Sequence, residues 1–310
     1  MARIVFMGTP QAAVPTLRQC VADGHEVVAV WTQPDKPSGR GNKVNFSPVK
    51  EFALSQGLSV FQPARIKNDE AKRLFSSHDA DLAVVVAYGR ILPDEFLRAP
   101  RRGCINVHFS LLPKYRGAAP TNWAIINGEK ETGVTTMFIE PSLDTGPILL
   151  QAKTEIGAAE TAPELMERLS GIGAELLSQT LARLGELTPQ PQDDSAATFA
   201  PILKKEDGLI DWSQSAYAIE RRVRGLQPWP NAHTSFRSKG LILWEAESAP
   251  SVTADVAEGE VIVAKGGELS VKCGEQTALR LFEVQPEARK RIPVRDFING
   301  MHLKVGERFG

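Results

Sequence analysis

Two polar side chains, Asn106 and His108, stand at the end of an apolar run, 103–108, that predicts a β-strand. Side chains of a strand alternate between its two faces, so both should point to the same side. A carboxylate, Asp144, follows a second predicted strand, 133–139. An amide donor, an acid or base and a carboxylate together suit the transfer of an acyl group to an amine. We therefore expect these three side chains to meet in one site.

The triplet Asp144-Thr145-Gly146 also matches the Asp-Thr-Gly sequence of aspartic proteases. Those enzymes need two such carboxylates that share a proton, supplied by duplicated lobes or by a symmetric dimer. This sequence has a single copy of the triplet and no duplicated halves. Aspartic-protease chemistry is therefore set aside.

The first half of the chain alternates strand and helix patterns, which predicts an α/β, Rossmann-like fold with a mostly parallel sheet and helices on both faces. The turn after the first strand has Pro10 and Ala13 where a dinucleotide fingerprint has glycines, so no NAD is expected. Strands are expected at 3–8, 25–32, 81–87, 103–108 and 133–139, and helices at 11–22, 48–56, 68–77 and 161–184.

The length of 310 residues suits two domains, since domains usually run about 100–200 residues. A polar stretch rich in Pro and Gln, 188–195, is typical of a linker. We expect a catalytic domain at 1–188, a linker at 189–206 and a second domain at 207–310. Short strands separated by turns predict that the second domain is a small β-barrel of the oligonucleotide-binding type.

The composition is that of an ordinary soluble protein, with 42% hydrophobic and 24% charged residues. No apolar run approaches the roughly 18 residues of a membrane span, and the start lacks the core of a signal peptide. We therefore expect no membrane partner. We also expect the protein to be cytoplasmic and to act as a monomer. The three cysteines are far apart and odd in number, so we expect neither disulfides nor a structural metal site.

The stretch 103–120, together with Leu143-Asp144-Thr145-Gly146, resembles the folate-dependent formyltransferases, and the resemblance extends over nearly the whole chain. It implies that a formyl group passes from 10-formyltetrahydrofolate to an amine, without a metal. On this resemblance Asn106 and His108 stabilise the developing oxyanion, and Asp144 holds His108 and helps to remove a proton from the amine. Phe109 differs from the family pattern, in which a small residue often occupies this position between the His and the Ser. We expect the Phe109 side chain to face away from the site.

The resemblance also assigns the folate site. Ser110, Leu111, Leu112 and Pro113 match the loop that contacts folate in this family. Apolar side chains and exposed backbone amides suit a flat pterin with hydrogen-bonding edges. The stretch 88–93 resembles the opposite wall of the same pocket.

A long loop, 32–43, is dense in proline, glycine and cations, and it resembles an insertion of the family members that act on tRNA. It implies methionyl initiator tRNA as the amine acceptor in translation initiation. Arg40 and Lys43 would contact phosphates or bases near the acceptor end. The second domain resembles the tRNA-binding part of the family, and its phosphate candidates are Arg221, Arg222, Arg224 and Lys239.

Three other functions stay open at this point. A nucleotide-sugar amine formyltransferase would share Asn106, His108 and Asp144, and a formyl-folate hydrolase would use water in place of the amine. A non-enzymatic RNA-binding module would keep a degenerate catalytic domain. The cationic loop favours tRNA over the first two, and the presence of all three polar residues weighs against the third.

Overall fold

The computed structural model describes residues 1–38, 43–249 and 255–310. Within these ranges the chain forms two compact units, each assembled from several segments. The first unit contains all three residues of the expected catalytic cluster. It comprises Met1–Pro120, Glu131–Glu155 and Met166–Pro201, whereas the second comprises Thr121–Lys130, Ile156–Leu165 and Ile202–Gly310.

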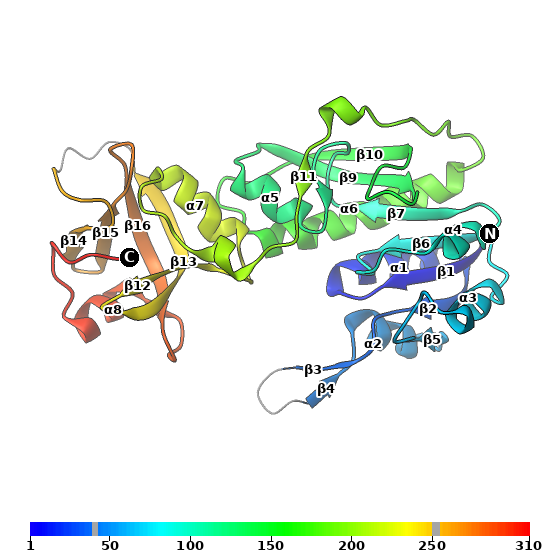
Figure 1. Cartoon of the computed structure of the whole chain (residues 1–310), viewed down its shortest axis with the longest axis horizontal. Helices are drawn as coiled ribbons and strands as arrows, with labels where there is room; N and C mark the ends of the chain where they lie inside the picture. Colours follow the sequence, from blue (N-terminus) through cyan, green and yellow to red (C-terminus); the bar gives the residue numbers. More distant parts are fainter. Residues whose placement is uncertain (39–42, 250–254) are drawn as a thin grey trace. The chain divides into compact units, whose positions relative to one another are not determined.

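A seven-stranded sheet forms the centre of the first unit, in the order β10-β9-β7-β6-β1-β2-β5 (Figure 1). Its strands are β1 (Arg3–Gly8), β2 (Glu26–Trp31), β5 (Val60–Phe61), β6 (Leu82–Val86), β7 (Cys104–His108), β9 (Glu131–Phe138) and β10 (Ile148–Glu155). The neighbouring strands β7, β6, β1, β2 and β5 pair in parallel, whereas β9 pairs antiparallel with β7 and β10 pairs antiparallel with β9. The predicted mostly parallel sheet is therefore confirmed.

Helices cover both faces of this sheet, as predicted. On one face, the ring of Trp31 lies 5.3 Å from that of Phe75 in α3 (Asp69–Ser76) and 5.4 Å from that of Phe96 in α4 (Asp94–Arg98). On the other face, Val107 of β7 packs so closely on Gly173 of α6 (Ala162–Arg183) that a Cβ there would lie 2.9 Å from Val107 Cγ1. The remaining helical elements of the unit are α1 (Val14–Ala22), α2 (Pro48–Ser55), η1 (Gln11–Ala13) and η2 (Asp194–Ala196).

Two short strand pairs complete the first unit. Strand β8 (Arg116–Gly117), just beyond β7, pairs in parallel with β11 (Phe199–Ala200). Strand β3 (Lys36–Ser38) pairs antiparallel with β4 (Lys43–Asn45). The pairing of β8 with β11 fixes the chain directly after the predicted catalytic strand.

The second unit, for which the sequence predicts a small β-barrel, is built on an antiparallel sheet in the order β12-β13-β16-β15-β14 (Figure 1). Strand β17 pairs with β16. Residues 306–310 connect its two outer strands, because Phe309 bridges to Phe236 and the N–H of Val261 donates to Glu307 O at 2.8 Å. The strands are β12 (Ala232–Phe236), β13 (Lys239–Ala249), β14 (Val261–Lys265), β15 (Glu268–Lys272), β16 (Ala278–Pro286) and β17 (Ile292–Pro293).

Helices flank this second sheet. Ala216, Ile219 and Val223 of α7 are buried, as their spacing predicts. Asn122 of α5 donates to Gly225 O at the end of α7, at 2.7 Å. The helical elements are α5 (Pro120–Ile126), α7 (Ala216–Gly225), α8 (Val294–Met301) and η3 (Lys205–Gly208).

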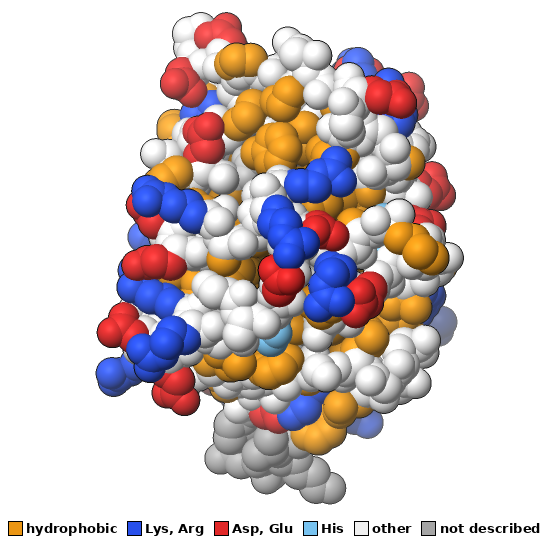
Figure 2. Space-filling view, turned by 90° about the vertical axis from the view of Figure 1, so that its right-hand side faces the viewer, with side chains coloured by type: hydrophobic (Ala, Val, Ile, Leu, Met, Phe, Trp, Pro, Cys, Tyr) orange, Lys and Arg blue, Asp and Glu red, His pale blue; other side chains and the backbone are white. Residues whose placement is uncertain are grey.

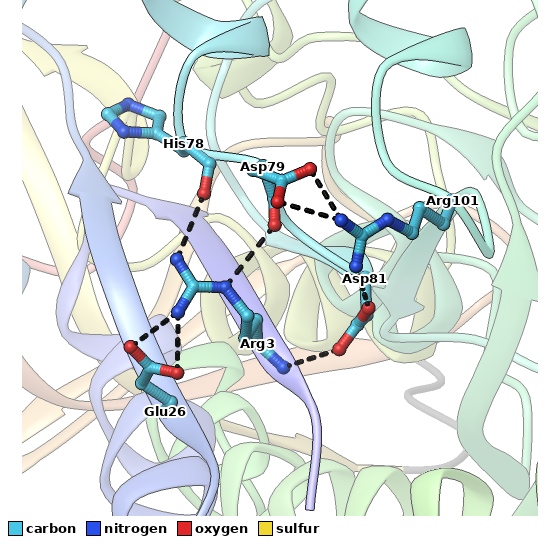
Figure 3. Close-up of polar contacts among 6 residues, drawn as sticks. All are labelled: Arg3, Glu26, His78, Asp79, Asp81 and Arg101. Carbon is cyan, nitrogen blue, oxygen red and sulfur yellow. Dashed lines mark hydrogen bonds and ion pairs between the residues drawn. The ribbon is translucent and has the colours of Figure 1, made fainter.

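Polar side chains form a network at the amino ends of β1 and β6 (Figure 3). The backbone N–H of Arg3 donates to Asp81, and its guanidinium donates to both carboxylate oxygens of Glu26. Arg101 pairs with Asp79 and Asp81 at 2.7 and 3.1 Å. The network ties β1 to β2 and to the turn before β6.

Basic and acidic side chains interleave across the face of the molecule shown in Figure 2, in keeping with the net charge of −1.

Candidate active site

His108 is the last residue of β7, and its side chain is 6% exposed. Its Nε2 atom lies 2.9 Å from the carbonyl oxygen of Tyr115, and its Nδ1 atom lies 3.7 Å from Oδ2 of Asp144. A carbonyl can only accept a hydrogen bond, so Nε2 carries a hydrogen. Nδ1 is therefore the ring nitrogen left to exchange a proton or to donate.

Asp144 is held in place by the backbone that follows β7. The N–H of Gly117 donates to Asp144 Oδ2 at 2.8 Å, so this one oxygen faces both the amide and His108. Asp144 has a φ of 51°, in the left-handed region that residues other than glycine rarely adopt. Such backbone conformations persist only where surrounding contacts enforce them, and they concentrate at functional sites.

The chain reaches Asp144 by a different path from the one that the sequence suggests. Strand β9 is antiparallel to β7, so its end at Phe138 lies beside Ile105 rather than beside His108. The loop that follows has to turn back across the sheet to bring Asp144 to Gly117. This turn requires a glycine, because a Cβ on Gly146 would lie 1.9 Å from Phe138 O.

Asn106 lies two residues before His108 and is partly exposed. Val107 and Phe109, which alternate with this pair, both approach Gly173 of α6 on the opposite face of the sheet. Asn106 and His108 therefore share one face, as the period of two predicts, and Phe109 faces away from them as expected. In the part of the chain that the structure describes, no protein group hydrogen-bonds to the Asn106 amide, which leaves it able to donate to a ligand.

The loop predicted to contact folate is tightly organised. The Ser110 hydroxyl is buried and donates to Lys114 O at 2.7 Å. The N–H of Leu112 donates to the Thr135 hydroxyl at 3.2 Å, and Leu112 O accepts from the Gln151 amide at 2.8 Å. Leu111 and Pro113 are partly exposed. These contacts make the loop a rigid wall at the end of β7.

A hollow of about 640 Å³ lies at the carboxyl side of the same sheet, and sequence reasoning named only part of its lining. Arg90 contributes to it, held by Gln33 Oε1 at 3.0 Å and by Pro63 O at 3.1 Å. Both of these partners are neutral, so they orient the guanidinium without cancelling its charge. The full lining is Arg65, Ile66, Lys67, Asn68, Arg90 and Ile91. The part of the lining that the sequence analysis missed could have been suggested by its two cations, Arg65 and Lys67, which stand two positions apart.

Not all of the residues predicted to contact tRNA lie within the described part of the chain. Arg40 lies outside the described residues, and Lys43 begins β4, where it pairs with Ser38 of β3. In the second unit, Arg224 forms an ion pair with Glu220 and donates to Glu160 O at 2.9 Å. Arg224 therefore sits in an internal ion pair, instead of offering an unpaired charge to a phosphate.

Within residues 1–38, 43–249 and 255–310, no three His, Cys, Asp or Glu side chains are placed to hold a metal ion. No helix in the same ranges combines the length and the apolar character needed to cross a membrane. Cys20, Cys104 and Cys273 are free and buried, and burial raises the pKa of each thiol to about 12.

Two family models together match most of the chain. One is described as formyl transferase and matches residues 2–181, and the other is described as formyl transferase, C-terminal domain, and matches residues 202–302. The first match contains the sheet with Asn106, His108 and Asp144, and the second contains the antiparallel sheet. The fold and the site thus define a formyl transferase.

Similar proteins narrow this class. A methionyl-tRNA formyltransferase from Solibacter usitatus is 52% identical over 99% of this chain and 98% of its own length. Another, from Caldanaerobacter subterraneus, is 49% identical over 98% of each chain. The chain belongs to the methionyl-tRNA formyltransferase family.

Solved structures share the fold at lower sequence identity. An N-formyltransferase from Helicobacter canadensis, in complex with folinic acid and dTDP-3-aminofucose, has a TM-score of 0.67 at 17% identity, covering 92% of this chain and 100% of that one. HypX from Aquifex aeolicus, in complex with tetrahydrofolic acid, has a TM-score of 0.63 at 17% identity, covering 99% of this chain and 48% of that one. These similarities concern the fold.

Proposed function

We propose that this protein transfers the formyl group of 10-formyltetrahydrofolate to the amino group of methionyl initiator tRNA. The observation that carries the proposal is the pairing of His108 with Asp144 beside the Gly117 amide. It occurs in a chain that is 52% identical to a methionyl-tRNA formyltransferase over nearly its full length. The site has the groups that formyl transfer to an amine requires.

Asn106 and His108 are assigned to the formyl oxygen. Negative charge develops on that oxygen when the neutral amine attacks the formyl carbon, and hydrogen-bond donors aimed at it lower the barrier. The Asn106 amide supplies one donor. His108 supplies the other through Nδ1 in its protonated form, because its Nε2–H already bonds the Tyr115 carbonyl.

Asp144 is assigned to proton transfer. The attacking nitrogen becomes positively charged as its bond to carbon forms, and the Asp144 carboxylate takes a proton from it directly or through one water. The bond from the formyl carbon to the donor nitrogen then breaks, and that nitrogen takes up the proton that Asp144 received, which returns Asp144 to its carboxylate form. These steps are all assigned to side chains, so the proposal needs neither a metal nor NAD.

The donor is assigned to the space between the loop at Ser110, Leu111, Leu112 and Pro113 and the hollow lined by Arg90. Folates combine a flat pterin with an anionic glutamate end. The apolar loop suits the pterin, and the cations Arg65, Lys67 and Arg90 suit the carboxylates. Arg90 supports this assignment because the two groups that orient it carry no charge.

The tRNA acceptor is assigned to the cationic loop. Arg40 and Lys43 are proposed to contact phosphates or bases near the acceptor end, where they would position the reactive amine. Phosphate contacts orient a nucleic acid without reading its sequence. If both cations contact phosphates, the choice of initiator tRNA depends on other contacts.

The test is a formylation assay with a radiolabelled formyl donor. Charged initiator methionyl-tRNA, a nucleotide-linked amino sugar and buffer alone are offered in parallel, with the His108→Ala variant as the control. We expect label in the aminoacyl-tRNA alone. Labelled sugar would indicate an amino-sugar formyltransferase, and free formate without an acceptor would indicate a hydrolase; either result would overturn the proposal.

A further inference from the structure

We propose that Gln192 and Arg116 are positioning residues, which hold the Asp144 loop in the conformation that proton transfer requires. The inference rests on the proposed function, since it assigns Asp144 a catalytic role. Gln192 lies 48 positions beyond Asp144, in the polar stretch whose composition predicts a linker. The network joins three segments of the first unit that are distant in the sequence.

The side-chain amide of Gln192 fastens the loop on both sides of Thr145. Its Nε2 atom donates to Asp144 O and to Gly146 O, each at 2.8 Å. Both hydrogens of the amide can thus be used on the backbone of the catalytic turn. A single side chain therefore fixes the backbone carbonyls of the residues immediately before and after Thr145.

The orientation of that amide is set by Arg116. Gln192 Oε1 accepts from Arg116 Nε at 3.1 Å and from Arg116 Nη2 at 2.9 Å. A guanidinium can only donate, so it selects the oxygen of the amide and turns the nitrogen toward the loop. Arg116 itself is 5% exposed and pairs with Asp194 at 2.7 Å, which restricts its own motion.

Arg116 also connects this support to the carboxylate. The next residue, Gly117, donates its N–H to Asp144 Oδ2, and both residues form β8, which pairs with β11. One short strand thus holds Asp144 at two points, at the side chain through Gly117 and at the backbone through Gln192. Two anchors explain how a residue that is not glycine keeps a φ of 51° there.

The Gln192→Glu variant separates this role from packing. It keeps the oxygen that accepts from Arg116 and removes the hydrogens that hold Asp144 O and Gly146 O. We expect kcat to fall about 10- to 100-fold, because a small displacement of a catalytic group is costly. The KM values for the donor and for the charged tRNA should change less than about threefold, since substrate-binding groups are untouched.

Gln190→Glu is the matched control, because it makes the same chemical change two residues away. Gln190 is exposed, and its amide donates to Thr188 O at 3.0 Å. Its kinetics should equal those of the wild type. Arg116→Lys gives a second variant, which keeps the positive charge but loses the fork that orients Gln192, so kcat should again fall with little change in KM.

The outcomes distinguish this inference from the proposed function. If wild-type protein fails to formylate tRNA, the proposed function falls, and the inference falls with it. If wild type is active and Gln192→Glu keeps its kcat, the inference alone is overturned. Active-site titration and circular dichroism check the fraction folded, and a loss explained wholly by fewer folded molecules would also overturn it.

Discussion

The Asp144 carboxylate lies 3.7 Å from the Nδ1 atom of His108, although the strand before Asp144 runs antiparallel to the strand that carries His108. This distance is longer than a hydrogen bond, so a small shift when substrate binds would bring the two groups into hydrogen-bond contact. The other nitrogen of the ring is already bonded to Tyr115 O. The ring is thus held by one nitrogen while the other faces the carboxylate.

The variants Asp144→Asn and His108→Ala test this pair directly. Each should lower kcat by at least about two orders of magnitude, because a proton acceptor or an oxyanion donor is removed. Steady-state kinetics with charged tRNA measure the loss, and circular dichroism confirms that the variants are folded. Turnover near that of the wild type in either variant would contradict the assigned roles.

The hollow lined by Arg65, Lys67 and Arg90 predicts a defect confined to the donor. The Arg65→Ala, Lys67→Ala double variant should raise the KM for 10-formyltetrahydrofolate about tenfold or more, because two charge-assisted contacts are lost. The KM for charged tRNA should stay within about twofold. Arg98→Ala, which removes a cation that is 82% exposed, is the control and should leave both values unchanged. Equal KM values for the donor in wild type and double variant would remove the hollow from the donor site.

The cationic loop predicts a defect confined to tRNA. The Arg40→Ala, Lys43→Ala double variant should weaken the use of charged tRNA and leave folate affinity unchanged. If the two residues contact phosphates, the dependence of kcat/KM on salt should also become shallower, because fewer counterions are released. Measurements of kcat/KM across a salt series, beside folate titrations, check this prediction. Unchanged tRNA kinetics would show that the loop does not take part in tRNA binding.

The network in Figure 3 predicts how stability depends on pH. The pKa of Asp81 is lowered from its ordinary value of 3.8, chiefly because its carboxylate accepts from the backbone N–H of Arg3, with a further contribution from Arg101. A carboxyl group whose pKa is lower in the folded protein stabilises the fold at pH values above its pKa in the unfolded chain. This stabilisation is lost as the pH falls through the pKa that the group has in the folded protein.

Asp81→Asn should therefore unfold at lower denaturant than the wild type at pH 7, and the difference should shrink below about pH 4. Urea titrations at pH 7 and at pH 3 measure the two free energies of unfolding. If the difference in free energy of unfolding between the two proteins grew as the pH fell, the lowered pKa of Asp81 would be contradicted. Asp94→Asn, which changes a carboxylate that is 57% exposed on α4, serves as the control.

Local pattern was sufficient for several of the elements and for half of the candidate site, although it did not predict strand β10 (Ile148–Glu155). Apolar runs predicted strands β1, β6 and β7 within a residue or two of their ends, because buried parallel strands need continuous apolar residues. The same reasoning placed Asn106 and His108 on one face, since alternation along a strand is a property of the backbone alone.

Tertiary structure decided the other half of the site. Nothing in the local sequence shows that β9 runs antiparallel to β7, so the path by which Asp144 returns to Gly117 could not be predicted. The polar composition around Gln192 predicted a linker. Composition does not reveal which distant groups a side chain will bond, so it could not predict the contacts of Gln192. Contacts across dozens of positions depend on how the chain packs as a whole, and only the folded structure places Gln192 and Arg116 behind the turn that carries Asp144.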